Sequence, residues 1–343
     1  MIPCCQTKLT TFRHSSNKSE IASNKLTLQA LHTTSHNFTW QTLTFGGASS
    51  SILYDVAIIN ENDIWAVGRI FVYDSTGQID PQIYNAIHWN GNDWELKRIH
   101  FTNSKNQIFL AEYKSIYAFS SDDVWFATDQ LSHWDGQEFK SIEIPTATFH
   151  SFINSLLGIS DTDLFIVGNY GNIARYINGA WQSIGSGTKT HITDIWGADN
   201  TILATVTDPY GTGDKRLLQI NLDGIVNSLN WYPNSRLQTV WFKSLHKVFI
   251  GGGAHIVGTP GNWRAIQGLP PYYSERIRGN DVNDVFLVGD FGLCAHFNGT
   301  SWYTYNELYN ADETLYGLAI NNNLVVAAGE AGNKALLVIG HRN

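Results

Sequence analysis

Residues 123–139 read Asp-Val-Trp-Phe-Ala-Thr-Asp-Gln-Leu-Ser-His-Trp-Asp-Gly-Gln-Glu-Phe, and versions of this phrase return along the chain. The phrase holds two short apolar runs, then an Asp-Gly or Asn-Gly dipeptide and an aromatic residue. Runs rich in β-branched and aromatic residues are typical of buried strands. Asn-Gly and Asp-Gly suit the positive backbone angles of tight hairpin turns. With the apolar strand that precedes it, each copy predicts a four-stranded antiparallel unit.

Seven such units can be aligned, and the last is incomplete. Their second strands begin at Asp63, Asp123, Asp163, Thr201, Lys247, Asp284 and Asn323. The seventh unit stops after its third strand, near Ile339, while a spare strand, residues 39–45, precedes the first unit. Units of roughly 40–45 residues are the usual size of a propeller blade, and closing the ring leaves no end blade exposed. The sequence therefore predicts an all-β fold, a seven-bladed β-propeller over residues 39–343, in which residues 39–45 complete blade seven.

Composition and charge narrow the function. Hydrophobic residues make up 43% of the 343 residues, charged residues only 15%, and the net charge is −8. Nucleic acid is not an expected partner, because phosphate binding needs a basic face. No apolar run has the length of a bilayer span, so no transmembrane segment is predicted. We expect a monomer.

The start of the chain carries a hypothesis about location. Residues 1–38 are predicted to be a disordered tether or a processed leader, since they show no sustained hydrophobic period. Cys4 or Cys5 would be a lipid-bearing first residue if the preceding residues are the end of a signal peptide. The alternative is a disordered tail. On the first reading the protein is extracytoplasmic, either secreted or lipid-anchored to the envelope. Cys294 is predicted to be a buried free thiol.

Most candidate chemistry is explained by the repeat. All twelve tryptophans fall in repeat strands, which favours core packing over stacking on a sugar. The repeated Asp63, Asp123, Asp163 and Asp284 are predicted to hydrogen-bond to their own turns. His88, His133 and His296 share one repeat position on three blades, so they are not expected to bind one metal. No catalytic residue, metal or cofactor is predicted.

Residues that depart from the repeat gather in loops that we expect at one rim of the ring. This rim holds the turns between second and third strands and the links between blades, including the long 100–114 link. Aromatic rings beside carboxylates suit a carbohydrate or a polar peptide. The predicted ligand-binding residues are Tyr73, Asp80, Tyr170, Asp208, Tyr210, Tyr272, Tyr273, Arg278 and Asp290.

One aligned position of the first strands reads Ala57, Tyr117, Leu157, Trp196, Trp241, Arg278 and Tyr316. If it faces the channel, Arg278 is its single charge. The alternative is that these aromatics pack between blades and Arg278 pairs with an acid such as Glu275 or Asp290, since a buried arginine is usually paired.

The phrase Asp-Val-Trp-Phe-Ala … His-Trp-Asp-Gly-x-x-Phe resembles bacterial propeller repeats of the Asp-box (BNR-like) group, which includes photosystem II assembly-factor propellers. The resemblance covers about residues 39–343 and implies the propeller architecture. It departs from a true Asp-box because His or Tyr stands where Ser would be.

Three functions remain open. The first is a non-catalytic propeller that binds a partner protein or a surface glycan at the cell envelope through the loop-rich rim. The second is a sialidase-like glycoside-active enzyme, which needs arginines such as Arg69, Arg216, Arg276 and Arg278 to meet at one pocket. The third is a passive structural scaffold. Fold alone does not decide among them.

Overall fold

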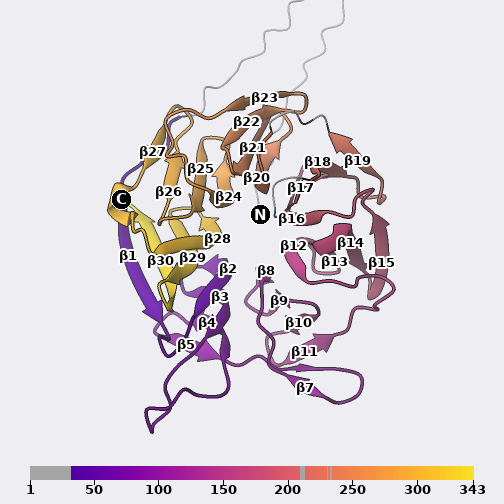
Figure 1. The fold of residues 1–343 in the computed structure, drawn as a ribbon, viewed down its shortest axis with the longest axis vertical. Helices are drawn as coiled ribbons and strands as arrows, with labels where there is room; N and C mark the ends of the chain where they lie inside the picture. Colours follow the sequence, from indigo (N-terminus) through magenta and orange to yellow (C-terminus); the bar gives the residue numbers. More distant parts are fainter. Residues whose placement is uncertain (1–31, 209–212, 230, 232–233) are drawn as a thin grey trace, which may run out of the picture. The chain divides into compact units, whose positions relative to one another are not determined.

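The computed structural model describes residues 32–208, 213–229, 231 and 234–343. These residues form seven four-stranded antiparallel sheets around a ring, which confirms the predicted fold (Figure 1). Blades one to three consist of β2 (Ile52–Asn60), β3 (Asp63–Ile70), β4 (Tyr84–Trp89), β5 (Trp94–Lys97); β8 (Ser115–Ser120), β9 (Asp123–Ala127), β10 (Leu131–Trp134), β11 (Phe139–Ile142); and β12 (Ile153–Ser160), β13 (Asp163–Gly168), β14 (Asn172–Ile177), β15 (Ala180–Gly185).

Blades four to six follow the same order. They consist of β16 (His191–Ala198), β17 (Thr201–Thr207), β18 (Lys215–Ile220), β19 (Val226–Leu229); β20 (Leu237–Ser244), β21 (Lys247–Gly252), β22 (Ile256–Thr259), β23 (Asn262–Ala265); and β24 (Ser274–Asp281), β25 (Asp284–Gly289), β26 (Cys294–Phe297), β27 (Trp302–Thr304). An extra hairpin of β6 (Phe101–Thr102) and β7 (Ile108–Phe109) lies in the link from blade one to blade two. Two short 3₁₀ turns, η1 (Asn169–Gly171) and η2 (Asn306–Leu308), complete the secondary structure of the described residues.

Blade seven joins the two ends of the propeller. It consists of β28 (Glu313–Asn321), β29 (Leu324–Ala331), β30 (Lys334–Arg342) and β1 (Phe38–Phe45). β1 pairs with β30 along its whole length, from Phe38 opposite Arg342 to Phe45 opposite Ala335, and Figure 1 shows the two strands side by side. The predicted closure by residues 39–45 is therefore confirmed.

The repeated aspartates and histidines meet across the second and third strands. The three pairs are His88–Asp63 (Nε2 to Oδ1, 2.9 Å), His133–Asp123 (2.7 Å) and His296–Asp284 (2.9 Å). The aromatic residue two positions after each aspartate stacks on the imidazole: Trp65 on His88 at 3.9 Å, Trp125 on His133 at 4.2 Å and Phe286 on His296 at 4.4 Å. In blade three, Arg175 replaces the histidine on Asp163. The prediction that these aspartates hydrogen-bond to their own turns is wrong, because a histidine or an arginine lies directly across the hairpin from each of them.

The apolar core lies between neighbouring blades. One buried cluster joins Val56 and Ile64 of blade one to Val326 and Leu337 of blade seven, and six similar clusters continue around the ring. All twelve tryptophans lie in the described residues and none is exposed. Stacking of blades therefore buries the faces that one sheet alone leaves open.

Cys294 is a buried free thiol, as predicted, and burial raises its pKa. Of the predicted tether, residues 1–31, with Cys4 and Cys5, lie outside the described residues. The segment from residue 32 to residue 37 contacts blade six: the Thr34 hydroxyl donates to the Asn283 carbonyl at 2.7 Å, and the Tyr305 hydroxyl donates to the His36 carbonyl at 3.0 Å. Among the described residues there is no helix of the length and hydropathy that a membrane span requires.

Candidate functional site

One end of the propeller carries most of the exposed apolar surface. Because strands alternate in direction, the turns from second to third strands and the links into each first strand lie at the same end, which we call the loop rim. Of the eleven large apolar or aromatic side chains exposed in the described residues, eight are on the loop rim: Tyr73, Ile79, Ile108, Phe109, Phe152, Tyr170, Phe291 and Tyr309. The other three are Ile159, Ile225 and Tyr303. An apolar surface gathered on one face is typical of a binding surface.

Two of these aromatics are held in a left-handed backbone conformation. Tyr170 (φ 58°) and Phe291 (φ 60°) occupy the same place in the second-to-third-strand turns of blades three and six, each followed by a glycine. They are 63% and 40% exposed. A non-glycine residue at positive φ is uncommon and costs roughly 1 kcal/mol or more. These turns therefore hold an aromatic ring in solvent at some expense to stability.

The first strands share a bulge at the loop rim. In six blades the pairing of first and second strands shifts by one residue near the start of the first strand. In blade two the equivalent residue is Lys114, which directly precedes the paired Ser115 and donates its N–H to Ala127. A bulge re-aims the side chain of the extra residue. The bulge residues of blades one to seven are Tyr54, Lys114, Asn154, Thr193, Gln238, Glu275 and Tyr316, and all seven line one cavity of about 370 Å³.

This cavity, which we call the channel mouth, is built on one side by two tyrosines and a lysine. The Lys114 ammonium lies 3.4 Å from the centroid of the Tyr54 ring and forms an ion pair with Glu112. Tyr316 donates its hydroxyl to Glu330 at 2.7 Å. Burial raises the pKa of both Tyr54 and Tyr316, so both phenols stay protonated at physiological pH.

On blade six, next to Tyr316, the channel mouth holds a partly buried acid, Glu275. Burial, and then the neighbouring Asp290 carboxylate, raises the pKa of Glu275 to about 7. Glu275 is thus about half protonated at neutral pH, and it can either donate or accept a hydrogen bond. Beside it the Tyr273 hydroxyl donates to the Gln238 side chain at 3.2 Å.

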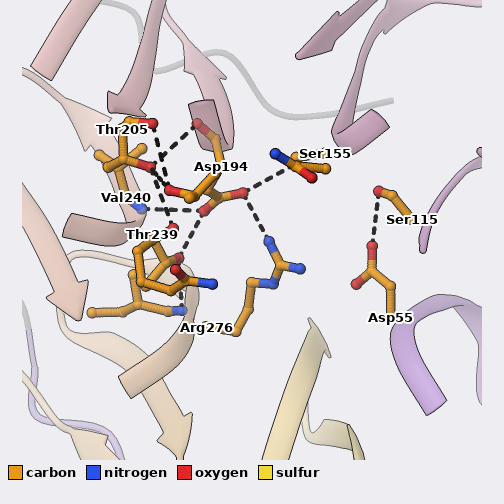
Figure 2. A network of polar contacts seen from close by, with 12 residues as sticks. Asp55, Ser115, Ser155, Asp194, Thr205, Thr239, Val240 and Arg276 are labelled. Atoms are coloured by element: carbon orange, nitrogen blue, oxygen red, sulfur yellow. Dashed lines mark hydrogen bonds and ion pairs between the residues drawn. The ribbon is translucent and has the colours of Figure 1, made fainter. Parts of the chain in front are cut away.

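A charge cluster lies beneath the channel mouth. Asp194, in β16, is fully buried and binds Arg276 Nη1 at 2.9 Å and both terminal nitrogens of Arg278 at 2.9 Å each. It also accepts hydrogen bonds from the Ser155 hydroxyl (3.0 Å), the Thr239 hydroxyl (2.7 Å) and the Val240 N–H (3.1 Å) (Figure 2). Burial opposes ionisation of Asp194, but the guanidinium groups of Arg278 and Arg276 hold its pKa well below its usual range. Four blades are joined at this one carboxylate.

A second cavity, of about 720 Å³, opens next to the channel mouth, and we call it the rim groove. One wall comes from the link between blades one and two, from Phe101 to Glu112, which contains the β6–β7 hairpin. Another wall is Thr128–Gln130 of blade two. Phe109 is 48% exposed and Phe152 is 57% exposed, and both line the groove. Its charged residues are Arg69, Glu112, Lys114, Asp129 and Glu143. Lys114 and Phe152 line both cavities, so the groove continues into the channel mouth.

Most of the aligned first-strand position faces the channel, as one hypothesis expected, whereas Trp241 is buried between blades five and six, as the other expected. Ala57, Tyr117, Leu157, Trp196 and Arg278 line a lower cavity of about 280 Å³. The seventh member of this row is Ala319 and not Tyr316, which occupies the bulge position. Arg278 pairs with an acid, as the other hypothesis expected, but that acid is Asp194 and not Glu275 or Asp290. Asp194 belongs to β16 of blade four, and Arg278 belongs to β24 of blade six. The two side chains meet across the intervening blade five.

The other predicted ligand-binding residues are spread around the loop rim. Tyr73 and Asp80 lie in the long loop of blade one, where Asp80 pairs with Arg98 at 2.5 Å. Tyr170 lines a separate cavity of about 440 Å³ on blade three.

Blade six brings together three more of them. The Tyr272 ring packs on Phe291 at 4.9 Å, Tyr273 reaches Gln238, and Asp290 lies beside Glu275. In blade four, Asp208 is engaged with a partner, whereas Tyr210 lies outside the described residues.

None of the predicted ligand-binding residues lines the rim groove. Its apolar residues Phe109 and Phe152 belong to links between blades, and the unusual length of the 100–114 link was the signal that pointed there. The arginine cluster required by the sialidase-like hypothesis does not form among its four candidates. Arg69 pairs with Glu112, and Arg216 pairs with Asp214 at 2.8 Å, while Arg276 and Arg278 share Asp194.

Comparison with known proteins shows the fold alone. No protein-family model matches this chain, and no curated protein matches it in sequence. Among solved structures it is similar to YCF48 bound to D1 peptide, with 14% identity and a TM-score of 0.66 over 89% of this chain and 95% of that one. YCF48 from Cyanidioschyzon merolae gives 13% identity and a TM-score of 0.64 over 88% and 98%. The WD40 propeller domain of Doa1 gives 12% and 0.56 over 89% and 97%.

Proposed function

We propose that this protein is a non-catalytic propeller whose loop rim binds an extended segment of a partner protein, with the rim groove as the main contact. Eight of the eleven large apolar side chains exposed in the described part of the chain lie on the loop rim, and this observation carries the proposal. Phe109 and Phe152 offer apolar anchor points on the walls of a cavity large enough for several side chains.

The comparisons agree with this proposal in a general way. The similar fold of YCF48 occurs in complex with a peptide, the D1 peptide. Propellers supply a rigid ring on which exposed loops form the contact surface. The groove's charges, three acidic and two basic, are spread among aromatic residues, which suits a segment that is neither strongly basic nor strongly acidic.

A peptide-display selection against the full chain tests the proposal. Peptides that bind the wild type are expected to lose roughly 30-fold in affinity for Phe109→Ser and for Phe152→Ser, because truncating an aromatic anchor costs about 2 kcal/mol. The matched control is Ile225→Ser, which removes an equally exposed apolar side chain outside the loop rim. Equal binding by all three variants contradicts the proposal.

The glycan hypothesis is an arm of the same experiment. A glycan array with the same variants would assign the surface to a sugar if glycans bind and peptides do not. The assignment to an Asp-box-like bacterial repeat group and the extracytoplasmic location remain predictions from the sequence, since the comparisons test neither and Cys4 and Cys5 lie outside the described residues.

A further inference from the structure

A buried guanidinium in the channel mouth makes one hydrogen bond and leaves its Nε without a partner. Arg276 lines the mouth and is 7% exposed. Its bond from Nη1 to Asp194 is the only hydrogen bond of this side chain to the described residues, and Nε is buried without a partner. Figure 2 shows Arg276 reaching Asp194 with one end of its guanidinium. Buried polar groups are nearly always paired, so this place is short of an acceptor.

The charge count at Asp194 points the same way. One carboxylate faces two guanidinium groups, and Arg278 binds both of its oxygens. Asp55 acts on Arg276 only through longer-range attraction. The Asp55 carboxylate accepts hydrogen bonds from the Ser115 hydroxyl and from the N–H groups of Ile116 and Val56. It forms no ion pair within the described part of the chain, and Arg276 is the cation without a carboxylate of its own.

Glu275 lies in the channel mouth beside Arg276. The negative charge of its carboxylate would repel a second carboxylate there. Burial and Asp290 favour its neutral form, which can donate a hydrogen bond instead. The titratable and charged groups that face it or share the mouth are Asp290, Arg276, Arg236, Tyr273, Tyr316, His191 and Lys114.

We propose that the channel mouth is a carboxylate-binding site, in which Arg276 holds the carboxylate and Glu275 lies beside it. The carboxylate is either a free small acid or an acidic side chain of a segment that enters from the rim groove. The inference goes beyond the proposed function, because a free acid needs no partner protein. A cavity of about 370 Å³ accepts either source.

The first arm of the test uses free acids. Acetate and succinate are titrated into the full chain at pH 6 and pH 8, at constant ionic strength, and binding is followed by saturation-transfer NMR. Acetamide and succinamide are the neutral counterparts. We expect carboxylates to bind at pH 6 and about tenfold more weakly at pH 8, when most Glu275 is ionised, and the amides not to bind.

Variants separate the roles of the residues. Arg276→Met should weaken carboxylate binding at least tenfold, whereas Arg216→Met, which removes a surface arginine paired with Asp214, should leave it unchanged. Glu275→Gln should bind equally at pH 6 and pH 8. His191→Gln should keep the fall between these pH values, which assigns it to Glu275. If Arg276→Met does not fold, as its melting curve will tell, Glu275→Gln decides.

The second arm tests an acidic side chain. A peptide selected for binding that contains Asp or Glu is compared with its Asn or Gln version, on the wild type and on Arg276→Met. A tenfold preference for the acidic version that disappears in Arg276→Met assigns the carboxylate to the partner. Failure of both arms overturns the proposal, as does equal binding of acids and amides. Failure of the peptide selection alone overturns the proposed function and leaves the carboxylate site standing.

Discussion

Asp194→Asn should destabilise the propeller more than any exposed charge substitution. Asp194 is fully buried and forms ion pairs with two guanidinium groups, those of Arg276 and Arg278. The asparagine keeps the shape of the side chain but leaves two buried cations without a counter-charge. Removing one partner of a buried ion pair costs roughly 3–5 kcal/mol. Two stranded cations and one lost acceptor oxygen place the expected value at the upper end of that range.

The control is an exposed ion pair on the same scaffold. Lys243 and Asp281 pair at 2.5 Å with side chains 56% and 32% exposed. Asp281→Asn should cost about 0–1 kcal/mol, because water and salt screen such pairs. Urea unfolding at pH 7, followed by tryptophan fluorescence, gives the free energy of unfolding of each variant. Equal values for the two variants would refute the reasoning.

A double-mutant cycle identifies the cause. If stranded cations are responsible, Arg278→Met should be less destabilising in the Asp194→Asn background than in the wild type. The pH dependence has a definite sign. The folded-state pKa of Asp194 lies below its unfolded value of about 3.9. Its stabilisation is complete above that unfolded value and is lost as pH falls through the folded pKa. Acidification should therefore weaken the wild type more than Asp194→Asn.

Two further predictions concern the seam of the ring. Deleting residues 38–45 removes the strand that pairs with β30 and should lower the melting temperature far more than deleting residues 1–31; equal melting temperatures would contradict closure by β1. His36 Nδ1 lies 2.8 Å from His296 Nδ1, and burial, then His296, lowers the pKa of His36 to about 4, below its unfolded value of about 6.5. The stability that neutral His36 contributes is complete above pH 6.5 and is lost as pH falls toward 4. Between pH 7 and pH 4 the melting temperature should therefore fall more steeply for the wild type than for His36→Asn. Parallel plots of melting temperature against pH would contradict this prediction.

The blade and the ring could be predicted because their signals are local. A strand, a tight turn and another strand are written within about twenty residues, and repetition makes the pattern unmistakable. The pairing of Asp63 with His88 is equally regular in the sequence. On the sequence alone, Asp63 is assigned to its turn, because its contact with His88 depends on the register between the second and third strands, which the sequence does not give.

The candidate site depends on contacts that no local pattern contains. Asp194 and Arg276 lie two blades apart in the chain, and only the packing of the blades around one channel brings them together. The alignment of the first strands is also wrong in blade seven, where a glycine follows Tyr316 as one follows Arg278 in blade six. Gly317 directly follows the bulge of its strand, and a Cβ there would lie 2.6 Å from the backbone of Asp55. Gly279 lies three residues further along the equivalent strand of blade six. The same residue type serves two different steric needs, and Tyr316 was placed in the wrong row.

The residue that follows each bulge shows why Arg276 calls for a functional explanation. The seven blades place Asp55, Ser115, Ser155, Asp194, Thr239, Arg276 and Gly317 there. In blade two this position is Ser115, whose hydroxyl donates a hydrogen bond to Asp55. In blade seven it is Gly317, which has no side chain. The fold therefore does not require a guanidinium here. A buried ion-pair cluster is weak evidence for stability, because well-packed apolar groups often do as well. A cation kept half-satisfied at the floor of a solvent-facing mouth is better explained by a ligand that completes its hydrogen bonds.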